Sequence, residues 1–308
     1  MQKVLVTGVN GFVGRHVAAE LRRRGITVVG LGGQAVEDSQ FVDQYVALDL
    51  TQPIDPSSFS FDGIDGVIHL AGLAAVGPSF DEPLHYVATN VGIETNLFEA
   101  AQAQGARPRF VIVSSGSLYS SSAELPLTET SIVSPNSPYA VSKLSQEFMA
   151  SYYGNRGFDC MLARPFNHFG PGQGLGFIAP DLAQQLVAIE RGTADHISVG
   201  NLDAERDYTD VRDIARAYID LLDKGQAGEL YNICNGTPRS GHELLNALLA
   251  SSDARPEIIQ DPARLRPADN PVVYGSHAKL SEHTGWQPTI SFETTAADVL
   301  SDWRSRDS

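Results

Sequence analysis

The sequence predicts an α/β fold, with a doubly wound parallel sheet covered by helices on both faces and a smaller α/β lobe beside it. Apolar, strand-like runs alternate with helical stretches along most of the chain. Residues from about 168 to 210 and from 237 onward break this alternation with Gly and Pro. We therefore expect one domain from residues 1–167 and 211–236 and a lobe from residues 168–210 and 237–308.

The predicted elements are short strands and longer helices. Strand-like runs lie near residues 3–7, 27–31, 45–48, 66–71, 110–115, 160–164 and 230–234. Helical stretches fit residues 14–24, 84–104, 139–153, 211–224, 240–250 and 294–304. Because such sheets bind ligands at the carboxyl ends of their strands, the functional site is expected there.

A glycine-rich turn follows the first strand-like run, where residues 7–14 read Thr-Gly-Val-Asn-Gly-Phe-Val-Gly. Gly8, Gly11 and Gly14 let the chain turn tightly and let its backbone approach a pyrophosphate at the amino terminus of the following helix. The spacing is G-x-x-G-x-x-G and not G-x-G-x-x-G. The strand before the turn and the helix after it nevertheless predict a Rossmann-like dinucleotide site.

Tyr139 and Lys143 form the most informative pair of residues in the chain. On a helix, positions i and i+4 lie on one face, so the phenol and the ammonium project into one site. An ammonium nearby stabilises tyrosinate, and we expect it to lower the pKa of Tyr139 toward the range useful for proton transfer. The pair indicates a proton donor or acceptor in a redox reaction.

Composition limits the classes of function. Hydrophobic residues make up 42% of the 308 residues, which is enough for a large core. A formal charge of −15 argues against a nucleic-acid partner. No apolar run is long enough to span a bilayer and no signal peptide is expected, so we expect a cytoplasmic protein with no membrane partner. Cys160 and Cys234 lie in apolar runs and are expected to be buried thiols, and no metal site is expected.

The glycine turn, Ser115 and the Tyr139/Lys143 pair together resemble the short-chain dehydrogenase/reductase superfamily, in its extended, nucleotide-sugar-modifying branch. The resemblance spans essentially the whole chain. Further matching segments are Asp49–Leu50, His69–Gly72, Asn90–Ala101, Val113–Tyr119, Arg164–Asn167, Asp207–Asp213 and Gly285–Trp286.

The resemblance implies an NAD(P)H site. Its expected residues are Gly8, Asn10, Gly11, Phe12, Val13, Asp49, Leu50, Leu70, Ala71, Gly72, Asn90, Tyr139, Lys143 and Pro165. The choice between NADH and NADPH stays open. Near the position of the usual acid or arginine the chain has Gly32, Gly33 and Gln34, with Glu37 and Asp38 slightly late and Arg15 as the nearest candidate for a 2′-phosphate.

Three residues are expected to carry the reaction. Tyr139 exchanges the proton of the carbinol oxygen, and Ser115 hydrogen-bonds the same oxygen. Lys143 holds the nicotinamide ribose and tunes the tyrosine. Ser114 and Ser117 crowd the same loop, so either hydroxyl stays an alternative to Ser115.

The loop before Tyr119 limits the chemistry. In related 4,6-dehydratases this loop carries an acidic pair or an equivalent acid, and in epimerase-reductases it carries a cysteine. Here the matching positions are Gly116 and Ser117, which provide neither an acid nor a thiolate. Dehydration and epimerisation next to a ketone are therefore disfavoured, whereas ketone reduction and 4-epimerisation both stay open.

The second lobe is similar to that of the GDP-4-keto-6-deoxy-D-mannose reductases of this superfamily. The matching segments are Ala163–Gln173, Val199–Asp207, Tyr231–Gly236, Gln260–Pro267, Gly275–Leu280 and Thr284–Trp286. The resemblance implies reduction of a GDP-linked 4-keto-6-deoxy sugar to GDP-D-rhamnose. A 4-epimerase, a reductase of another nucleotide sugar and a non-catalytic cofactor-binding protein stay as alternatives.

The same resemblance implies the residues that bind the substrate and the form of the assembly. Asn167 is expected to contact the sugar or a phosphate, and Arg206 and Arg266 the pyrophosphate, because a guanidinium donates two parallel hydrogen bonds to phosphate oxygens. Ser117 and Asp269 complete the set. A homodimer is expected through a four-helix bundle formed by residues 84–104 and 139–153 of each subunit.

Overall fold

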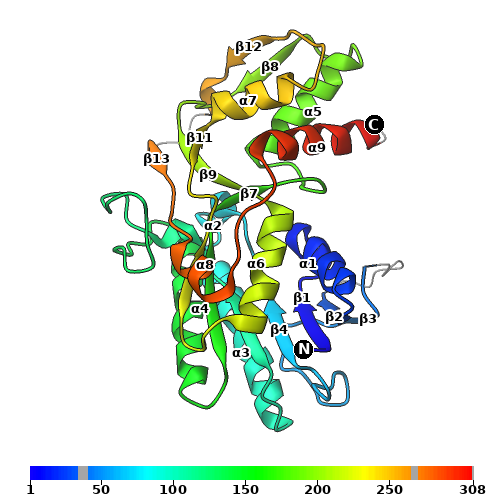
Figure 1. Ribbon diagram of the computed structural model, residues 1–308, viewed down its shortest axis with the longest axis vertical. Coiled ribbons are helices and arrows are strands. Elements are labelled where there is room, and N and C mark those ends of the chain that lie inside the picture. The colour runs from blue at the N-terminus through cyan, green and yellow to red at the C-terminus, as the bar shows by residue number, and fades with distance from the viewer. Residues whose placement is uncertain (34–40, 265–269, 307–308) are drawn as a thin grey trace.

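The structure, a computed structural model, describes residues 1–33, 41–264 and 270–306. Its larger part is built on a seven-stranded sheet in the order β10-β6-β5-β4-β1-β2-β3, and every pairing in it is parallel (Figure 1). The strands are β1 (Lys3–Thr7), β2 (Thr27–Gly32), β3 (Gln44–Ala47), β4 (Gly66–His69), β5 (Arg109–Val113), β6 (Cys160–Pro165) and β10 (Leu230–Ile233). The strand order reverses direction between β1 and β4, where ligands bind in sheets of this kind.

Helices cover both faces of this sheet, because apolar residues alternate to both sides of its strands. Helices α1 (Phe12–Arg23), α6 (Val211–Lys224) and α8 (Ala278–Thr284) pack on one face. Helices α3 (Pro83–Ala103) and α4 (Pro138–Gly154) pack on the other. The predicted doubly wound α/β fold is confirmed.

Two hydrogen bonds fix how α3 and α4 lie against each other. The Asn90 side chain donates to the Ser142 hydroxyl at 2.8 Å, and the Tyr153 hydroxyl donates to the Glu99 carboxylate at 2.6 Å. From the first bond to the second, the residue number increases along both helices. The helices therefore run parallel, and the register between them is set.

The smaller part forms the upper half of Figure 1 and has its own core. Helices α5 (Ile178–Glu190), α7 (Gly241–Leu249) and α9 (Phe292–Ser305) pack there with the parallel pair β8 (His196–Val199) and β12 (Glu257–Gln260). A four-stranded sheet lies between the two parts. The remaining elements are β7 (Asn167–Phe169), β9 (Glu205–Asp210), β11 (Pro238–Ser240), β13 (Val272–Val273), α2 (Val76–Ser79), η1 (Gly116–Leu118) and η2 (Pro262–Arg264).

Helices α5 and α8 are absent from the sequence-based expectation. Pro180 lies in α5, in a stretch punctuated by glycines, and such punctuation favours a loop. Pro180 does not prevent the helix, because it is the third residue of α5 and the first turn of a helix tolerates proline. Leu182, Ala183 and Leu186 then supply a buried face.

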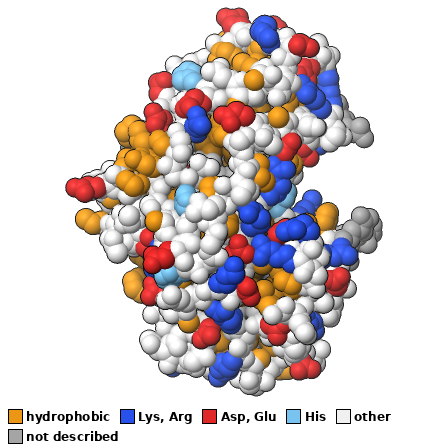
Figure 2. Space-filling view, viewed as in Figure 1, with side chains coloured by type: hydrophobic (Ala, Val, Ile, Leu, Met, Phe, Trp, Pro, Cys, Tyr) orange, Lys and Arg blue, Asp and Glu red, His pale blue; other side chains and the backbone are white. Residues whose placement is uncertain are grey.

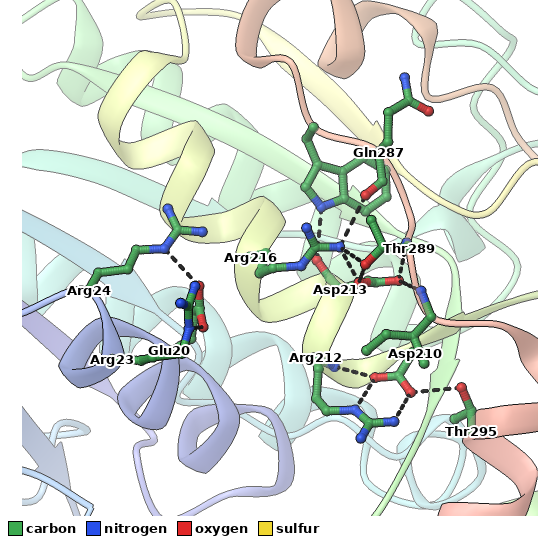
Figure 3. A network of polar contacts seen from close by, with 12 residues as sticks. Glu20, Arg23, Arg24, Asp210, Arg212, Asp213, Arg216, Gln287, Thr289 and Thr295 are labelled. Carbon is green, nitrogen blue, oxygen red and sulfur yellow. Dashed lines mark hydrogen bonds and ion pairs between the residues drawn. The ribbon is translucent and has the colours of Figure 1, made fainter.

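The amino-terminal end of α6 holds the chain segment that crosses between the two parts (Figure 3). Asp213, on the first turn of α6, accepts hydrogen bonds from the backbone amides of Thr289 and Ile290 at 2.8 and 3.0 Å. Its own carbonyl accepts from the Trp286 indole at 3.0 Å. Asp210 caps α6 and accepts from the Thr295 hydroxyl of α9 at 2.7 Å.

The predicted division of the chain into two regions stays a prediction. Leu280 and Trp286 belong by sequence to the predicted lobe, yet they pack in the core beneath the large sheet.

Lys and Arg side chains gather on one face where the two parts meet (Figure 2). No helix in the described part of the chain is long and apolar enough to cross a membrane.

Candidate active site

The glycine turn lies against the end of β4. Gly8 has a φ of 66°, and a Cβ added there would lie 2.8 Å from the Ala71 backbone nitrogen. A Cβ on Gly14 would lie 2.7 Å from the Cα of Val9. Helix α1 begins at Phe12, and the residue before it, Gly11, places no side chain over the free amides of the first turn. Such a cradle fits a pyrophosphate.

Thr7 connects this turn to the neighbouring loop. Its hydroxyl accepts hydrogen bonds from the backbone amides of Leu70 and Ala71, both at 3.1 Å. It also lies 2.8 Å from Nδ1 of His69. The predicted cofactor residues after β1 and after β4 therefore form one continuous edge.

A cavity of about 620 Å³ extends from the glycine turn to β13 of the smaller part. It brings together most of the predicted site residues. Those that line it are Gly8, Gly11, Phe12, Val13, Leu70, Gly72, Ser115, Ser117, Tyr139, Lys143, Pro165, Asn167 and Arg206. Among the described residues, the predicted members outside its lining are Asn10, Asp49, Leu50, Ala71 and Asn90.

The three predicted catalytic residues face this cavity. The Lys143 ammonium donates to the Val113 carbonyl at 2.8 Å, which ties α4 to the end of β5. Tyr139 is buried one turn earlier on α4. The Ser115 hydroxyl caps the short helix η1 by accepting from the Ser117 amide at 3.1 Å. The Ser114 hydroxyl donates a hydrogen bond to Glu147 at 2.5 Å. Because this hydroxyl is already paired, Ser115 is favoured over Ser114 as the catalytic serine.

Burial controls the electrostatics of the pair on α4. It raises the pKa of Tyr139 above its ordinary value, and the hydrogen bond from Ser115 acts in the opposite direction. Burial lowers the pKa of Lys143 to about 8, against the effect of Glu94 and Glu147. The expectation that Lys143 lowers the Tyr139 pKa is wrong here, because desolvation of the phenol prevails.

Two of the predicted cofactor residues, Asn10 and Asp49, bond to neighbouring protein groups. The Asn10 side chain donates to the Tyr45 hydroxyl at 2.8 Å, at the edge strand β3. Asp49 is exposed and binds the amide and hydroxyl of Thr51, at 3.0 and 2.7 Å. Leu50 is buried. Gln34, Glu37 and Asp38 lie outside the described residues.

Asn90 lies behind the cavity. Its side chain accepts from the Leu73 amide at 2.7 Å and donates to the Leu73 carbonyl at 3.1 Å. A Cβ on Gly72 would lie 2.8 Å from the Asn90 oxygen. Asn90 therefore fixes the loop after β4.

At the other end of the cavity, Asn167 and Ser117 are exposed to it. One guanidinium nitrogen of Arg206 donates hydrogen bonds to the carbonyls of Glu205 and Asn270, both at 2.8 Å. Those bonds hold the arginine at the cavity wall. Arg266 and Asp269, the other predicted substrate residues, lie outside the described residues.

His168 is a cavity residue for which the sequence shows no partner. Its ring stacks on Phe12, with 6.2 Å between ring centroids and 9° between ring planes. Its Nδ1 donates to the Phe166 carbonyl at 2.9 Å, and burial lowers its pKa, so the ring is neutral. A histidine three residues after Pro165 was the available signal, but its partner is a backbone atom that sequence does not show.

The parallel sheet, the glycine turn and the Tyr139/Lys143 pair on one cavity define a member of the extended short-chain dehydrogenase/reductase superfamily. A family model described as GDP-mannose 4,6 dehydratase matches residues 5–299. The chain belongs to this family and is an NAD(P)-dependent nucleotide-sugar enzyme.

Individual relatives agree with this membership. The chain is 38% identical to the GDP-6-deoxy-D-mannose reductase of Pseudomonas aeruginosa, over 99% of this chain and 98% of that protein. It is 29% identical to the GDP-6-deoxy-D-talose 4-dehydrogenase of Aggregatibacter actinomycetemcomitans, over 90% of each chain. A solved structure of RMD from Pseudomonas aeruginosa, complexed with NADPH, has a TM-score of 0.86 at 36% identity and covers 99% of this chain and 100% of its own.

Proposed function

We propose that this chain uses NAD(P)H to reduce the C4 ketone of GDP-4-keto-6-deoxy-D-mannose to GDP-D-rhamnose. The observation that carries the proposal is that Ser115, Tyr139 and Lys143 face one cavity that begins at the glycine turn. The similarity to the Pseudomonas aeruginosa reductase supports the choice of substrate.

The reduced nicotinamide supplies the hydride. Tyr139 donates a proton to the C4 oxygen as negative charge develops there, and Ser115 donates a hydrogen bond to the same oxygen. Because burial raises the pKa of Tyr139, the phenol holds its proton at neutral pH until that charge forms. Lys143 holds the ribose next to the nicotinamide.

The loop before Tyr119 supports reduction over dehydration. Gly116 and Ser117 occupy the positions of the acidic pair. A Cβ on Gly116 would lie 3.1 Å from the Phe166 ring, so the site leaves little room for a larger side chain there. The chain therefore keeps the residues for hydride and proton transfer without an acid to expel the C6 hydroxyl.

The GDP moiety is assigned to the wall formed by the smaller part. Arg206 and Arg266 bind the pyrophosphate, Asn167 and Ser117 bind the sugar side, and Asp269 binds ribose hydroxyls in this proposal. Because two carbonyls already hold one nitrogen of Arg206, its guanidinium loses little freedom when it binds phosphate.

One alternative is 4-epimerisation, which needs the same three residues. The chain is 28% identical to the UDP-glucose 4-epimerase of Bacillus subtilis, over 98% of this chain and 96% of that protein. Another alternative is a reductase that gives GDP-6-deoxy-talose, which the Aggregatibacter relative supports. The non-catalytic cofactor-binding role that the sequence left open does not agree with membership of this enzyme family.

A coupled assay separates these functions. GDP-mannose dehydratase generates the 4-keto sugar in place, NADH and NADPH are supplied separately, and the product is identified by NMR. We expect cofactor oxidation with a D-rhamnose product. A talose-type product indicates the opposite hydride face, and protection from heat by UDP-sugars but not by GDP-sugars indicates another substrate.

We also propose a homodimer through α3 and α4. Leu84, Val141, Phe148 and Tyr152 expose 80, 43, 68 and 43% of their surface on these two helices. Exposed apolar side chains on these two helices favour burial against a second copy. The expected cytoplasmic location stays a prediction.

A further inference from the structure

Polar side chains from three elements meet behind Lys143. They are His69 at the end of β4, Glu94 on α3 and Gln146 on α4, and all three are buried. Among the residues that the structure describes, both oxygens of Glu94, both amide atoms of Gln146 and Nε2 of His69 make no hydrogen bond of ordinary geometry. Buried polar atoms in folded proteins are nearly always paired, so this cluster calls for a functional explanation.

The register of α3 against α4 places Glu94 beside the catalytic helix. Asn90 bonds to Ser142, and Glu94 lies one turn further along α3, just as Gln146 lies one turn further along α4. The helices run parallel, so Glu94 faces Gln146 and the neighbouring Lys143. The Gln146 amide lies close enough to favour the ionised form of Glu94.

Glu94 and Lys143 favour each other's charged forms. Burial raises the pKa of Glu94 well above its ordinary value, and Lys143 acts against that rise. Burial likewise lowers the pKa of Lys143 to about 8, and Glu94 is the larger of the two carboxyl effects that oppose it. The attraction between Glu94 and Lys143 therefore opposes the effect of burial on the pKa of each group.

The other titratable groups that act in this region are already paired or neutral. Glu147, the second carboxyl acting on Lys143, accepts two hydrogen bonds from Arg164 at 2.7 and 2.6 Å. Burial lowers the pKa of His69 to about 3, so its ring is neutral. Burial raises the pKa of the Cys160 thiol beside Glu94 to about 12. Among these described groups, Glu94 is thus the carboxyl that most favours the charged form of Lys143.

We propose that Glu94 is a positioning residue of this site, which holds Lys143 as an ammonium aimed at the cavity, with Gln146 and His69 forming the polar pocket around the pair. The inference rests on the proposed role of Lys143 in binding the cofactor ribose. It predicts that Glu94 affects the reaction through Lys143 and does not touch substrate.

The test is the pH dependence of kcat/KM in Glu94→Gln, with Glu99→Gln as the matched control. Both variants make the same change on α3, but Glu99 is exposed and bonds to Tyr153. We expect the alkaline limb of Glu94→Gln to move to lower pH by about one unit, because Lys143 loses an opposite charge. The control is expected to keep the wild-type profile. A Glu94→Gln profile that matches wild type, with or without a change in Tm, overturns the proposal.

A second variant tests for a pH shift in the opposite direction. It also keeps the proposal testable if Glu94→Gln does not fold. Gln146→Glu adds a carboxyl beside Lys143 and is expected to move the alkaline limb to higher pH; an unchanged limb counts against the proposal. The pH dependence of NADPH affinity, measured by fluorescence without any sugar, shows the same shifts if Lys143 binds the cofactor. If the pH dependence of NADPH affinity shifts but no turnover is found, the role of Glu94 stands and the proposed reaction is rejected. If turnover is found but neither pH dependence shifts, the proposed reaction stands and the role of Glu94 is rejected.

Discussion

The Lys143 ammonium donates a 2.8 Å hydrogen bond to the carbonyl of Val113, the last residue of β5. This bond fixes the helix that carries Tyr139 to the strand that leads into Ser115. The bond therefore connects the helix of the phenol to the strand that ends two residues before Ser115. Rigid placement of this kind is what proton transfer requires.

Tyr139→Phe is expected to reduce turnover more than about a hundredfold, because the variant loses the proton donor. Cofactor affinity is expected to persist, because the glycine turn is untouched. Steady-state kinetics and cofactor titration measure the two effects. Tyr152→Phe makes the same change on the proposed dimer face of this helix, outside the cavity lining, and is the control. Retention of more than about a hundredth of the wild-type rate in Tyr139→Phe argues against the proton-donor role.

Ser115→Ala is expected to lower kcat by about a hundredfold, because it removes a hydrogen-bond donor to the C4 oxygen. Ser117→Ala, two residues away, is expected to change kcat by less than about tenfold. The two hydroxyls lie 2.9 Å apart, so the comparison separates their roles. Equal losses in both variants would assign the contact to the serine pair instead of to Ser115.

Gly8→Ala is expected to weaken cofactor binding at least about tenfold, because the new Cβ meets the backbone of the loop after β4. Gly25→Ala is the matched control. Gly25 also has a positive φ, of 74°, but no atom lies within 4 Å of its Cβ position. It is expected to cost about 1 kcal/mol of stability and to leave affinity unchanged. Loss of affinity in both variants would show that strain alone explains the effect.

Wild-type kcat/KM is expected to fall as pH rises through about 8. Burial lowers the pKa of Lys143 to about 8, so the ammonium predominates below that pH and is lost above it. A pH profile with stability controls at each pH measures the limb. An alkaline limb near the ordinary lysine pKa of about 10.4 would show that Lys143 keeps its proton throughout.

Phe148→Glu is expected to convert the proposed homodimer to a monomer, because it would place a charge in the proposed apolar interface. Light scattering at micromolar concentration measures the mass. Ile258→Glu, on β12 and away from both helices, makes the same kind of change at an exposed apolar residue and is expected to leave the dimer intact. A monomeric wild-type protein contradicts the proposed assembly.

The fold could be predicted well because its signals are local. Strand β1, the glycine turn and helix α1 follow each other within 23 residues, and each depends on the residue types of its own segment. The pairing of Tyr139 with Lys143 is likewise set by helical spacing. Helix α8 escaped prediction because its burial depends on contacts with α6 and β10, which are distant in sequence.

The electrostatics of the site could not be predicted from the sequence. Glu94 lies four residues after Asn90, so spacing alone places both on one face of α3. Nothing in the sequence shows that this face packs against Lys143. The direction of the Tyr139 pKa shift depends on burial for the same reason, and burial is a property of the folded chain.

The central claim is net reduction of a keto sugar nucleotide, and the most direct test is stoichiometry. Purified GDP-4-keto-6-deoxy-mannose is incubated with the protein and reduced cofactor, and the cofactor oxidised is compared with the sugar product formed. The account predicts that one molecule of cofactor is oxidised for each molecule of GDP-D-rhamnose. Failure to oxidise cofactor with this ketone would contradict it, and inversion of a 4-hydroxy nucleotide sugar at C4 without net loss of reduced cofactor would establish a 4-epimerase instead.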